Sequence, residues 1–489
     1  MKKKQVKFSG FDWSLQDLEV MWDEVDKLGK GYGLNYSQPI MEVVTAEQMI
    51  DYSTTVGLPS TYTHWSYGKG FHQEYEDYIK GQRGLAYEMI INTERPIAYI
   101  MENNTLALQL LVLAHACVGH ADFFKNNYLF KQYTQPETIV SFCNYAKDFV
   151  EDCETKLGIS RVESILDAAH SLQYNGVDKY VRSTVDPNDD LLSKYYKQHE
   201  DKVENYNELY DGLRPASKRI PDILYQDPKA PTHFPEENIL FFMEKYSPSL
   251  NDLEKELVRI VRYIGNYLFP QMRTKIMNEG WASFWHHTLM NDLYDTGVIS
   301  EGIYLEAITN HCGVIHQQEH SAFNPYTLGF KIFKDIQRMC TNPTKEDLKY
   351  FPQLKGAHWL DVIKDIREDY IDTSFILQWL SPKVIRDLKM FTLHDDVTKP
   401  SYVVSTISDD KSYQKLKEDM SEQYNIINFI PEVLITSCDW KDTKEIHIRN
   451  NTYKHRSLEA TNSLKVVRHL ETLWGKGKVV APGSMIHNN

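Results

Sequence analysis

Two histidines interrupt the most apolar stretch of the chain. His115 and His120 lie in residues 111–124, among leucine, valine, alanine and phenylalanine. An imidazole inside such a helix needs a partner, and a metal ion can serve as one. The five-residue spacing sets the two rings about 140° apart on a regular α-helix, so both reach one ion only if the helix ends or widens near Gly119. Two alternatives stay open: rings bonded to buried carbonyls, and an acid–base role without metal.

The pair differs from the best-known zinc-protease motif. In HExxH the histidines stand at i, i+4 with a glutamate as general base, whereas here Ala116 occupies the position of that glutamate. A site built on His115 and His120 must therefore take its other ligands and its base from elsewhere in the chain.

A glutamate in a tryptophan-rich run is the next candidate. Glu279 stands near Trp281 and Trp285, and His286 follows it at i, i+7 on the same helical stripe. A glutamate among bulky apolar side chains is rarely buried unless it is paired. We therefore predict Glu279 as a third metal ligand, with an exposed glutamate beside core tryptophans as the alternative.

Four further residues could join such a site. Asp167 and His170 stand at i, i+3 on one helical face, which suits shared ligation of an ion or a carboxylate that orients the ring. A solvated face explains this pair as well. Glu88 and Glu102 bracket a predicted hairpin, and either could be an extra ligand or a general base, with solvation at the sheet edge as the alternative.

Other motifs point away from chemistry. His316 and His320 stand at i, i+4 but in a polar stretch, which favours a surface loop. The sequence has no glycine-rich phosphate loop, no GxSxG elbow and no dinucleotide fingerprint. Nucleotide chemistry therefore has no support.

Mainly helical elements must position these residues. Ser14 precedes an apolar helical pattern that runs to Leu28. Two β-rich runs, 87–92 and 97–101, meet at a turn and predict a hairpin. Further helical patterns cover 105–120, 136–156, 160–173 and much of 237–392, including a helix start at Ser381-Pro382. The proline-punctuated residues 186–232 predict a surface excursion.

The C-terminal part alternates between strands and helices. Predicted strands at 402–407, 432–438, 445–449 and 478–480, with helices at 413–424 and 464–474, give the order βαββαβ of a ferredoxin-like sandwich. The predicted fold class is mainly α. Residues 1–395 form a large helical bundle with a small β-hairpin and the metal site, and residues 396–489 form a small α/β ferredoxin-like domain.

Composition excludes several classes of function. The formal charge of -14, from 54 Lys+Arg against 68 Asp+Glu, disfavours nucleic acid and anionic lipid as general partners. The basic N-terminus lacks the apolar run of a secretory signal, and we count no segment approaching the roughly 20 apolar residues of a membrane span. The six scattered cysteines fit reduced thiols in a cytoplasm.

Several motifs in order resemble one known family, the SpoVR (stage V sporulation protein R) family. The motifs that carry the resemblance are His64-Trp65-Ser66-Tyr67-Gly68-Lys69, Gly84-Leu85-Ala86-Tyr87-Glu88, His115 to Asn127, Asn278-Glu279-Gly280-Trp281-Ala282 and Asn324-Pro325-Tyr326-Thr327-Leu328-Gly329-Phe330. They span essentially the whole chain. The resemblance implies a cytoplasmic bacterial protein, linked in spore formers to assembly of the spore cortex, a peptidoglycan layer. It also implies an AAA+ serine kinase and a von Willebrand-domain protein of a stress or sporulation pathway as partners.

Two functions follow as hypotheses. In the first, the chain is a metal-dependent enzyme, a hydrolase, in which His115, His120 and Glu279 bind zinc, iron or manganese and Glu88 or Glu102 takes a proton from water. Asp167 and His170 would extend this set to two iron or manganese ions. In the second, the chain is a regulatory scaffold that docks a partner through its C-terminal domain, and the histidines are structural.

Overall fold

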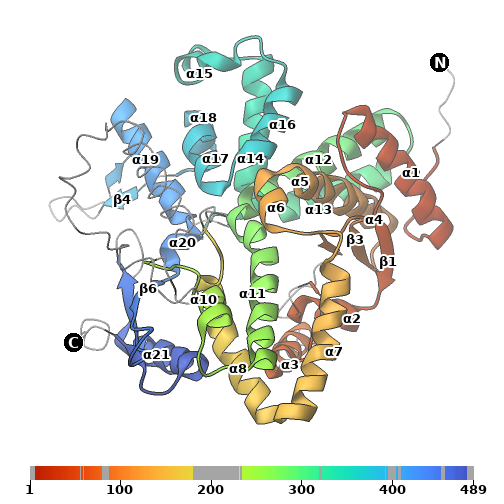
Figure 1. The fold of residues 1–489 in the computed structure, drawn as a ribbon. Helices are drawn as coiled ribbons and strands as arrows, with labels where there is room; N and C mark the ends of the chain where they lie inside the picture. The colour runs from red at the N-terminus through yellow and green to blue at the C-terminus, as the bar shows by residue number, and fades with distance from the viewer. Residues whose placement is uncertain are drawn as a thin grey trace, which may run out of the picture. The chain divides into compact units, whose positions relative to one another are not determined.

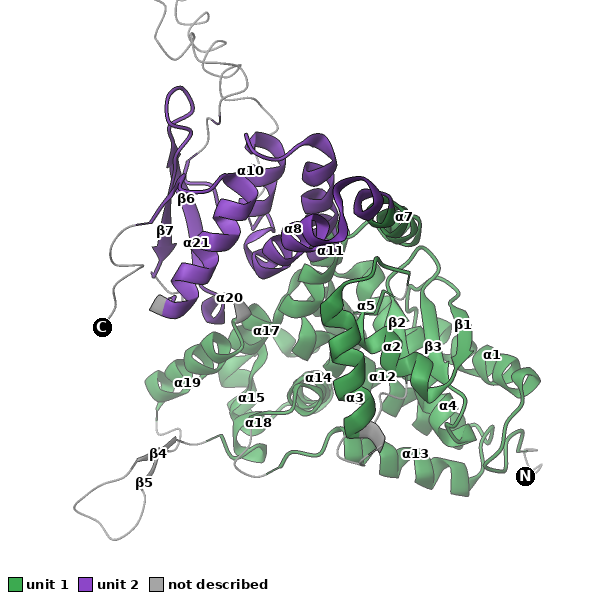
Figure 2. Ribbon diagram, turned by 90° about the horizontal axis from the view of Figure 1, so that it is seen from below, with its two compact units in different colours: residues 1–151, 267–426 green, residues 152–266, 427–489 purple. Residues whose placement is uncertain are grey.

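The chain folds into two compact units. The computed structural model describes residues 6–55, 57–58, 60–79, 88–179, 231, 234–318, 322–390, 392–394, 403–405, 409–452 and 458–481. Unit 1 comprises residues 1–151 and 267–426, and unit 2 comprises residues 152–266 and 427–489 (Figure 2). All three boundaries fall inside helices: α7 (Ile139–Leu157), α11 (Asp252–Arg273) and α20 (Ile426–Phe429). The boundary predicted between residues 395 and 396 stays a prediction; in this division residues 427–489 share a unit with residues 152–266.

Unit 1 begins with the predicted capped helix and hairpin. Helix α1 (Leu15–Gly31) starts after Ser14, whose hydroxyl accepts a hydrogen bond from the backbone of Asp17. The strands β1 (Ile40–Val44), β2 (Glu88–Ile91) and β3 (Ile97–Met101) form a sheet in the order β1-β3-β2. Strands β2 and β3 are antiparallel, which confirms the hairpin, and β1 adds a parallel strand that was not predicted. Helices α2 (Ala46–Thr54) and α3 (Trp65–Ile79) follow β1.

The two-histidine stretch is the central helix of unit 1. It consists of α4 (Leu106–Val112), a π-helical segment η1 (Leu113–His120) and α5 (Ala121–Asn126). The π-helix confirms that the helix widens at these histidines. By length and composition Leu106–Asn126 qualifies as a membrane span, which corrects our count of none, but 94% of its most apolar window is buried inside the protein. Its apolar character is that of a core helix.

Helix α12 (Lys275–Asp295) packs closely against two neighbours. A Cβ added to Gly119 of η1 would lie 2.6 Å from the Ala282 Cα, so the two backbones nearly touch. A Cβ added to Gly280 would lie 2.4 Å from the Gly329 Cα of α14 (Pro325–Thr341). The glycines therefore let α12 lie close to both η1 and α14, and Figure 2 shows α12 and α14 next to each other within unit 1.

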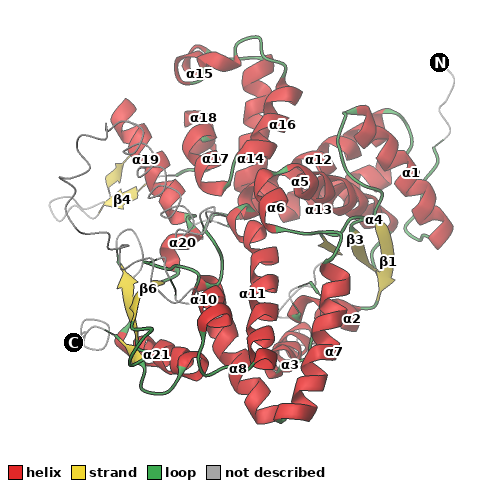
Figure 3. Ribbon diagram, viewed as in Figure 1, coloured by secondary structure: helices red, strands yellow, loops and turns green. Residues whose placement is uncertain are grey.

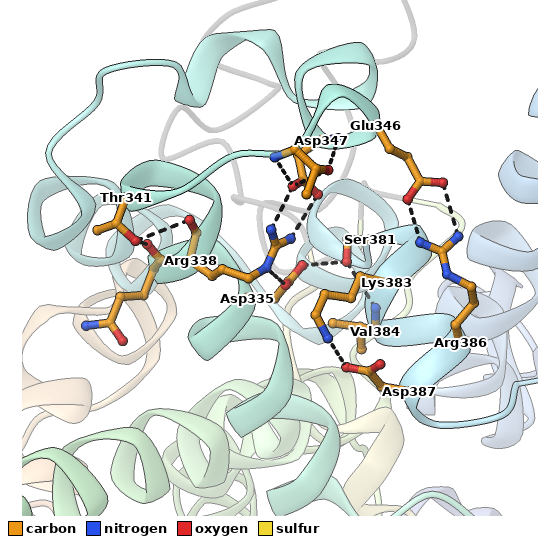
Figure 4. Close-up of polar contacts among 12 residues, drawn as sticks. Asp335, Arg338, Thr341, Glu346, Asp347, Ser381, Lys383, Val384, Arg386 and Asp387 are labelled. Carbon is orange, nitrogen blue, oxygen red and sulfur yellow. Dashed lines mark hydrogen bonds and ion pairs between the residues drawn. The ribbon is translucent and has the colours of Figure 1, made fainter.

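The remaining helices of unit 1 surround this core. They are α6 (Tyr128–Tyr133), α13 (Glu301–Val314), α15 (Lys345–Tyr350), α16 (Trp359–Asp369), α17 (Asp372–Trp379), α18 (Pro382–Asp387), α19 (Asp410–Gln423) and α20 (Ile426–Phe429), the last of which reaches into unit 2. Helix α18 begins at the predicted position, with the Ser381 hydroxyl capping it. The Arg338 guanidinium bonds to Asp335 in its own helix and to Asp347 of α15, and Ser381 bonds to Asp335, which joins α14, α15 and α18 (Figure 4).

Unit 2 combines helices with a small sheet. Its sheet has the order β6-β7-β8, formed by β6 (Glu432–Cys438), β7 (Ile446–Asn451) and β8 (Val479–Val480). Its helices include α8 (Ile159–Ser171), α10 (Ile239–Tyr246), α21 (Ala460–Trp474) and the first part of α11 (Figure 1). Short helical turns lie at Gln173–Asn175 in this unit and at Pro352–Leu354 in unit 1. Trp474 is fully buried, its ring centroid 5.2 Å from that of Phe242.

The ferredoxin-like domain is not confirmed. Its helices and strands lie close to their predicted positions, and Figure 3 shows the chain as mainly helical with few strands. Within the described residues, however, β5 (Val403–Ser405) pairs with β4 (Thr392–His394) and not with the sheet of unit 2. A four-stranded ferredoxin-like sheet needs that strand. The predicted excursion at 186–232 lies outside the described residues, apart from residue 231.

Candidate metal centre

The π-helix brings His115 and His120 onto one side of the central helix. In a π-helix the hydrogen bonds run from i to i+5, so residues five apart lie nearly one turn from each other. The two ring centroids lie 4.6 Å apart with the ring planes at 87°. Both side chains are buried among apolar residues, with 3% and 7% of their residue surfaces exposed. Two imidazoles so placed can share one ion.

Glu279 of α12 adds a third atom that could bind the same ion. Its Oε2 lies 3.6 Å from the His115 Nε2 and 3.5 Å from the His120 Nε2. The three atoms lie within 4.8 Å of one another, and Oε2 is buried without a hydrogen-bond partner. These separations are longer than hydrogen bonds. They resemble the roughly 3.4 Å between two ligand atoms that each bind a tetrahedral ion at about 2.1 Å.

The other ring nitrogens are engaged elsewhere. The His120 Nδ1 lies 2.8 Å from the Oδ1 of Asn278, and the His115 Nδ1 lies 2.8 Å from the Nδ1 of His286. The amide oxygen only accepts, so His120 carries its proton on Nδ1 and directs the lone pair of Nε2 at Glu279. Metal-binding histidines have such a partner on the second nitrogen.

A second carboxylate and two aromatic rings complete the surroundings. The Glu88 Oε1, on strand β2, lies 3.7 Å from the His115 Nε2. The Phe124 ring stacks on His120 at 5.9 Å, and the Tyr326 ring lies parallel to His115 at 6.1 Å. The nitrogen and oxygen atoms of the cluster therefore meet inside a mostly apolar shell.

The charges in the cluster favour a cation. Burial alone would raise the pKa of Glu279, but its interactions with His115 and His120 outweigh burial and lower it, so Glu279 is ionised. Burial lowers the pKa of His120 to about 4, which leaves that ring neutral. Burial also acts to lower the pKa of His115, but Glu279 and Glu88 together raise it, so a proton takes the position of a cation there.

Glu88 has a different environment from Glu279. Burial is the main cause that raises its pKa, the charge of Glu279 raises it further, and His115 acts in the opposite direction. A carboxyl with a raised pKa beside a metal site has the property that a general base or acid needs near neutral pH.

The structure places the other predicted site residues elsewhere. Glu102 is exposed after the last residue of β3, where it lines a surface cavity of about 610 Å³ with Phe11 and Trp13. Asp167 and His170 lie on α8 in unit 2 and do not belong to the cluster of His115, His120 and Glu279. His316 is exposed after α13, and His320 lies outside the described residues. The cluster thus contains His115, His120 and Glu279, with Glu88 beside it.

Sequence reasoning gave no role to several residues at the site. Asn278 and Tyr326 stand in the motifs that carry the family resemblance, and His286 was noted only for its spacing from Glu279. His311 of α13 was not considered. The sequence pattern that could have identified His311 is the four-residue spacing of Ile303, Ala307 and His311. This spacing places a histidine on the buried face of α13.

The fold and the cluster define a mainly helical protein with a candidate two-histidine, one-glutamate metal centre in its core. The family model described as "SpoVR like protein" matches residues 12–429, and the chain belongs to this family. It is 38% identical over 481 residues to an Escherichia coli (strain K12) protein named "Uncharacterized protein YcgB", a match that covers 97% of this chain and 94% of the relative. No solved structure matches the chain.

Proposed function

We propose that this chain is a metal-dependent hydrolase in which His115, His120 and Glu279 bind one divalent ion and Glu88 is the general base. The proposal rests on the convergence of the His115 Nε2, the His120 Nε2 and the Glu279 Oε2 on one point, with both Nδ1 atoms already engaged. The links to spore-cortex peptidoglycan, stress response and a kinase pathway rest on family resemblance and form part of the same proposal.

The ligand set suits catalysis better than a structural role. Structural zinc sites use four protein ligands, most often cysteines and histidines, whereas catalytic sites with two histidines and one glutamate keep a position open for water. The nearest cysteine along the helix, Cys117, has its pKa raised by burial and is not in the cluster. Three ligands therefore fit an ion that also binds water or substrate.

Each residue at the site has a distinct task in the proposed hydrolysis. A bound divalent ion would lower the pKa of a water and polarise the oxygen of the bond to be cleaved. Glu88 accepts the proton that the attacking water loses and returns it to the leaving group. Asn278 and His286 hold the two imidazoles in place, and the Tyr326 hydroxyl, whose interaction lowers the pKa of Glu279, helps to keep that carboxylate ionised.

The same ligand set favours one second function. Two histidines and one carboxylate also bind iron(II) in oxygenases that leave several positions open. Glu88 favours the hydrolase over the oxygenase. A carboxyl with a raised pKa beside the ion can activate water, and oxygen chemistry does not require such a group. The identity of the bound metal separates them experimentally.

Metal content tests the proposal. Protein purified without chelator should contain close to one equivalent of zinc by mass spectrometry, and His120→Ala and Glu279→Gln should lose it while keeping their helical circular dichroism. Glu88→Gln should keep the metal, since it removes the base and not a ligand. His316→Ala, at an exposed histidine, is the matched control. Iron in place of zinc would favour the oxygenase, and a wild-type chain that takes up no metal on reconstitution would refute both.

A further inference from the structure

A row of hydrogen-bonded imidazoles extends from the candidate metal centre into the core. The His115 Nδ1 lies 2.8 Å from the Nδ1 of His286, and the Nε2 of His286 lies 2.6 Å from the Nδ1 of His311. The three rings come from η1, α12 and α13, and all lie in unit 1. Both distances are those of hydrogen bonds.

This row is unusual because its members are buried. His286 is 1% exposed and His311 is 4% exposed, and the His311 ring packs edge-on against Phe330 at 4.9 Å. A buried polar ring costs free energy unless both of its nitrogens are satisfied. Leucine at either position would fill the same apolar space without that cost. The three rings therefore point to a requirement beyond packing.

A metal on the first ring would fix the direction of the row. If the His115 Nε2 binds an ion, its proton is on Nδ1 and is donated to the Nδ1 of His286. His286 then carries its proton on Nε2 and donates it to the Nδ1 of His311. Each ring thus has one defined tautomer, set by the one before it.

The second ligand offers a comparison within the same chain. The Oδ1 of Asn278 accepts from the His120 Nδ1 at the same 2.8 Å that separates His115 from His286. An asparagine ends the contact there, whereas the histidine at 286 continues it to α13. The two contacts of His286 thereby connect η1 with α13.

We propose that His286 and His311 are positioning residues that hold His115, by this relay of hydrogen bonds, in the ring orientation and tautomer that metal binding needs. The proposal rests on the proposed function, since it takes His115 as a ligand. It adds that the affinity for the ion depends on a helix, α13, that supplies no ligand to the cluster.

Two isosteric variants of His286 test the relay. In His286→Asn the amide oxygen replaces Nδ1 and can still accept from His115, whereas in His286→Gln the amide replaces Nε2 and reaches only toward His311. Zinc affinity of the full chain is measured by competition with a chelator, and the visible absorption of the cobalt(II)-loaded chain reports ligand geometry. We expect His286→Asn to keep the zinc affinity and the cobalt(II) spectrum close to those of the wild-type chain. His286→Gln should lose about 10- to 100-fold in affinity and change the spectrum.

A double-mutant cycle tests the role of His311. His311→Leu should lower the affinity of the wild-type chain but have no further effect in the His286→Asn background, where the relay already ends at residue 286. His469→Leu, at a partly buried histidine of unit 2, should change nothing. Equal affinities for His286→Asn and His286→Gln, or equal effects of His311→Leu in both backgrounds, would overturn the relay. A wild-type chain that binds no zinc would overturn the proposed function itself.

Discussion

In the proposed metal centre, a proton and a metal ion would compete for the Nε2 of His115. In the metal-free protein burial acts to lower the pKa of His115, but Glu279 and Glu88 raise it above its ordinary value of 6.5. Below that raised pKa the ring holds a proton on the nitrogen that faces Glu279. His120, with a pKa of about 4, is neutral over the same range. The neutral His120 could therefore bind an ion directly, whereas His115 must first lose a proton.

We accordingly predict that metal affinity rises with pH. Below the raised pKa of His115 the affinity should increase about tenfold per pH unit, with one proton released per ion, and it should level off above that pKa. Calorimetry at pH 6 in buffers with different ionisation heats measures the proton release. Glu88→Gln removes one of the charges that raise this pKa, so its plateau should begin at lower pH. An affinity that stays constant between pH 5.5 and 8 would contradict the prediction.

A sequence indicates candidate ligands only where a polar residue stands out from its neighbours. His115, His120 and Glu279 were predicted because each interrupts an apolar run, and Glu88 because it borders a hairpin. Asp167 and His170 were predicted from their i, i+3 spacing on α8, which lies in the other unit. Spacing within one helix cannot show which distant helix faces it. For the same reason His311, whose partner is 25 residues away, was not found.

At the scale of elements, two glycine contacts set the position of Glu279. Gly280 follows Glu279 directly, and a Cβ there would lie 2.4 Å from the backbone of Gly329. Gly119 next to His120 makes a similar approach to Ala282 of α12. Because backbone atoms cannot move aside as a flexible side chain can, an added methyl group must push the helices apart.

Gly280→Ala should therefore weaken metal binding without touching a ligand. We expect a loss of about 1–3 kcal/mol in stability and a clear fall in zinc affinity, because Glu279 moves with the displaced helix. The matched control is Gly313→Ala on α13, where an added Cβ meets nothing within 4 Å and alanine favours the helix. Urea unfolding and chelator competition measure the two effects. Equal zinc affinity in the two variants would show that the close contact does not position the site.

The π-helix shows what spacing can and cannot predict. Two histidines at i, i+5 required a widened helix if they were to share an ion, and η1 covers both positions. The prediction rested on the geometry that two histidines need in order to share one ion. It did not rest on any helical preference of the residues. The π-helix extends from Leu113 to His120, and its Gly119 lies against Ala282 of α12, a contact between distant parts of the chain. Such information is absent from a local window.

At the scale of the whole molecule, the order of elements was predicted better than their pairing. The order of strands and helices near the C-terminus matches the prediction, yet β5 pairs with its neighbour β4, and β6 to β8 share a unit with residues 152–266. Sequence order permits both arrangements, and only the buried faces decide between them. On α21 those faces include Leu470, Leu473 and Trp474.

The distribution of the site over the units leads to a prediction about stability. The three ligands of the proposed centre and the histidine relay belong to unit 1, so a bound ion should stabilise that unit by about 2.7 kcal/mol at a hundred times the Kd. Hydrogen exchange resolved by peptide should show greater protection of η1 and α12 in zinc-loaded protein. Helices α8 and α21 of unit 2 contain no ligand of the cluster, and their exchange should stay nearly unchanged.

Trp474→Ala provides the opposite perturbation in the same chain. The Trp474 ring is fully buried beside Phe242 and its Nε1 donates to the Lys444 carbonyl at 2.6 Å, so truncation should cost unit 2 about 3–5 kcal/mol. Exchange of α8 and α21 should then accelerate, while zinc affinity stays at the wild-type value. If the truncation weakened zinc binding as strongly as Glu279→Gln does, the candidate metal centre would depend on more of the molecule than the unit that supplies its ligands.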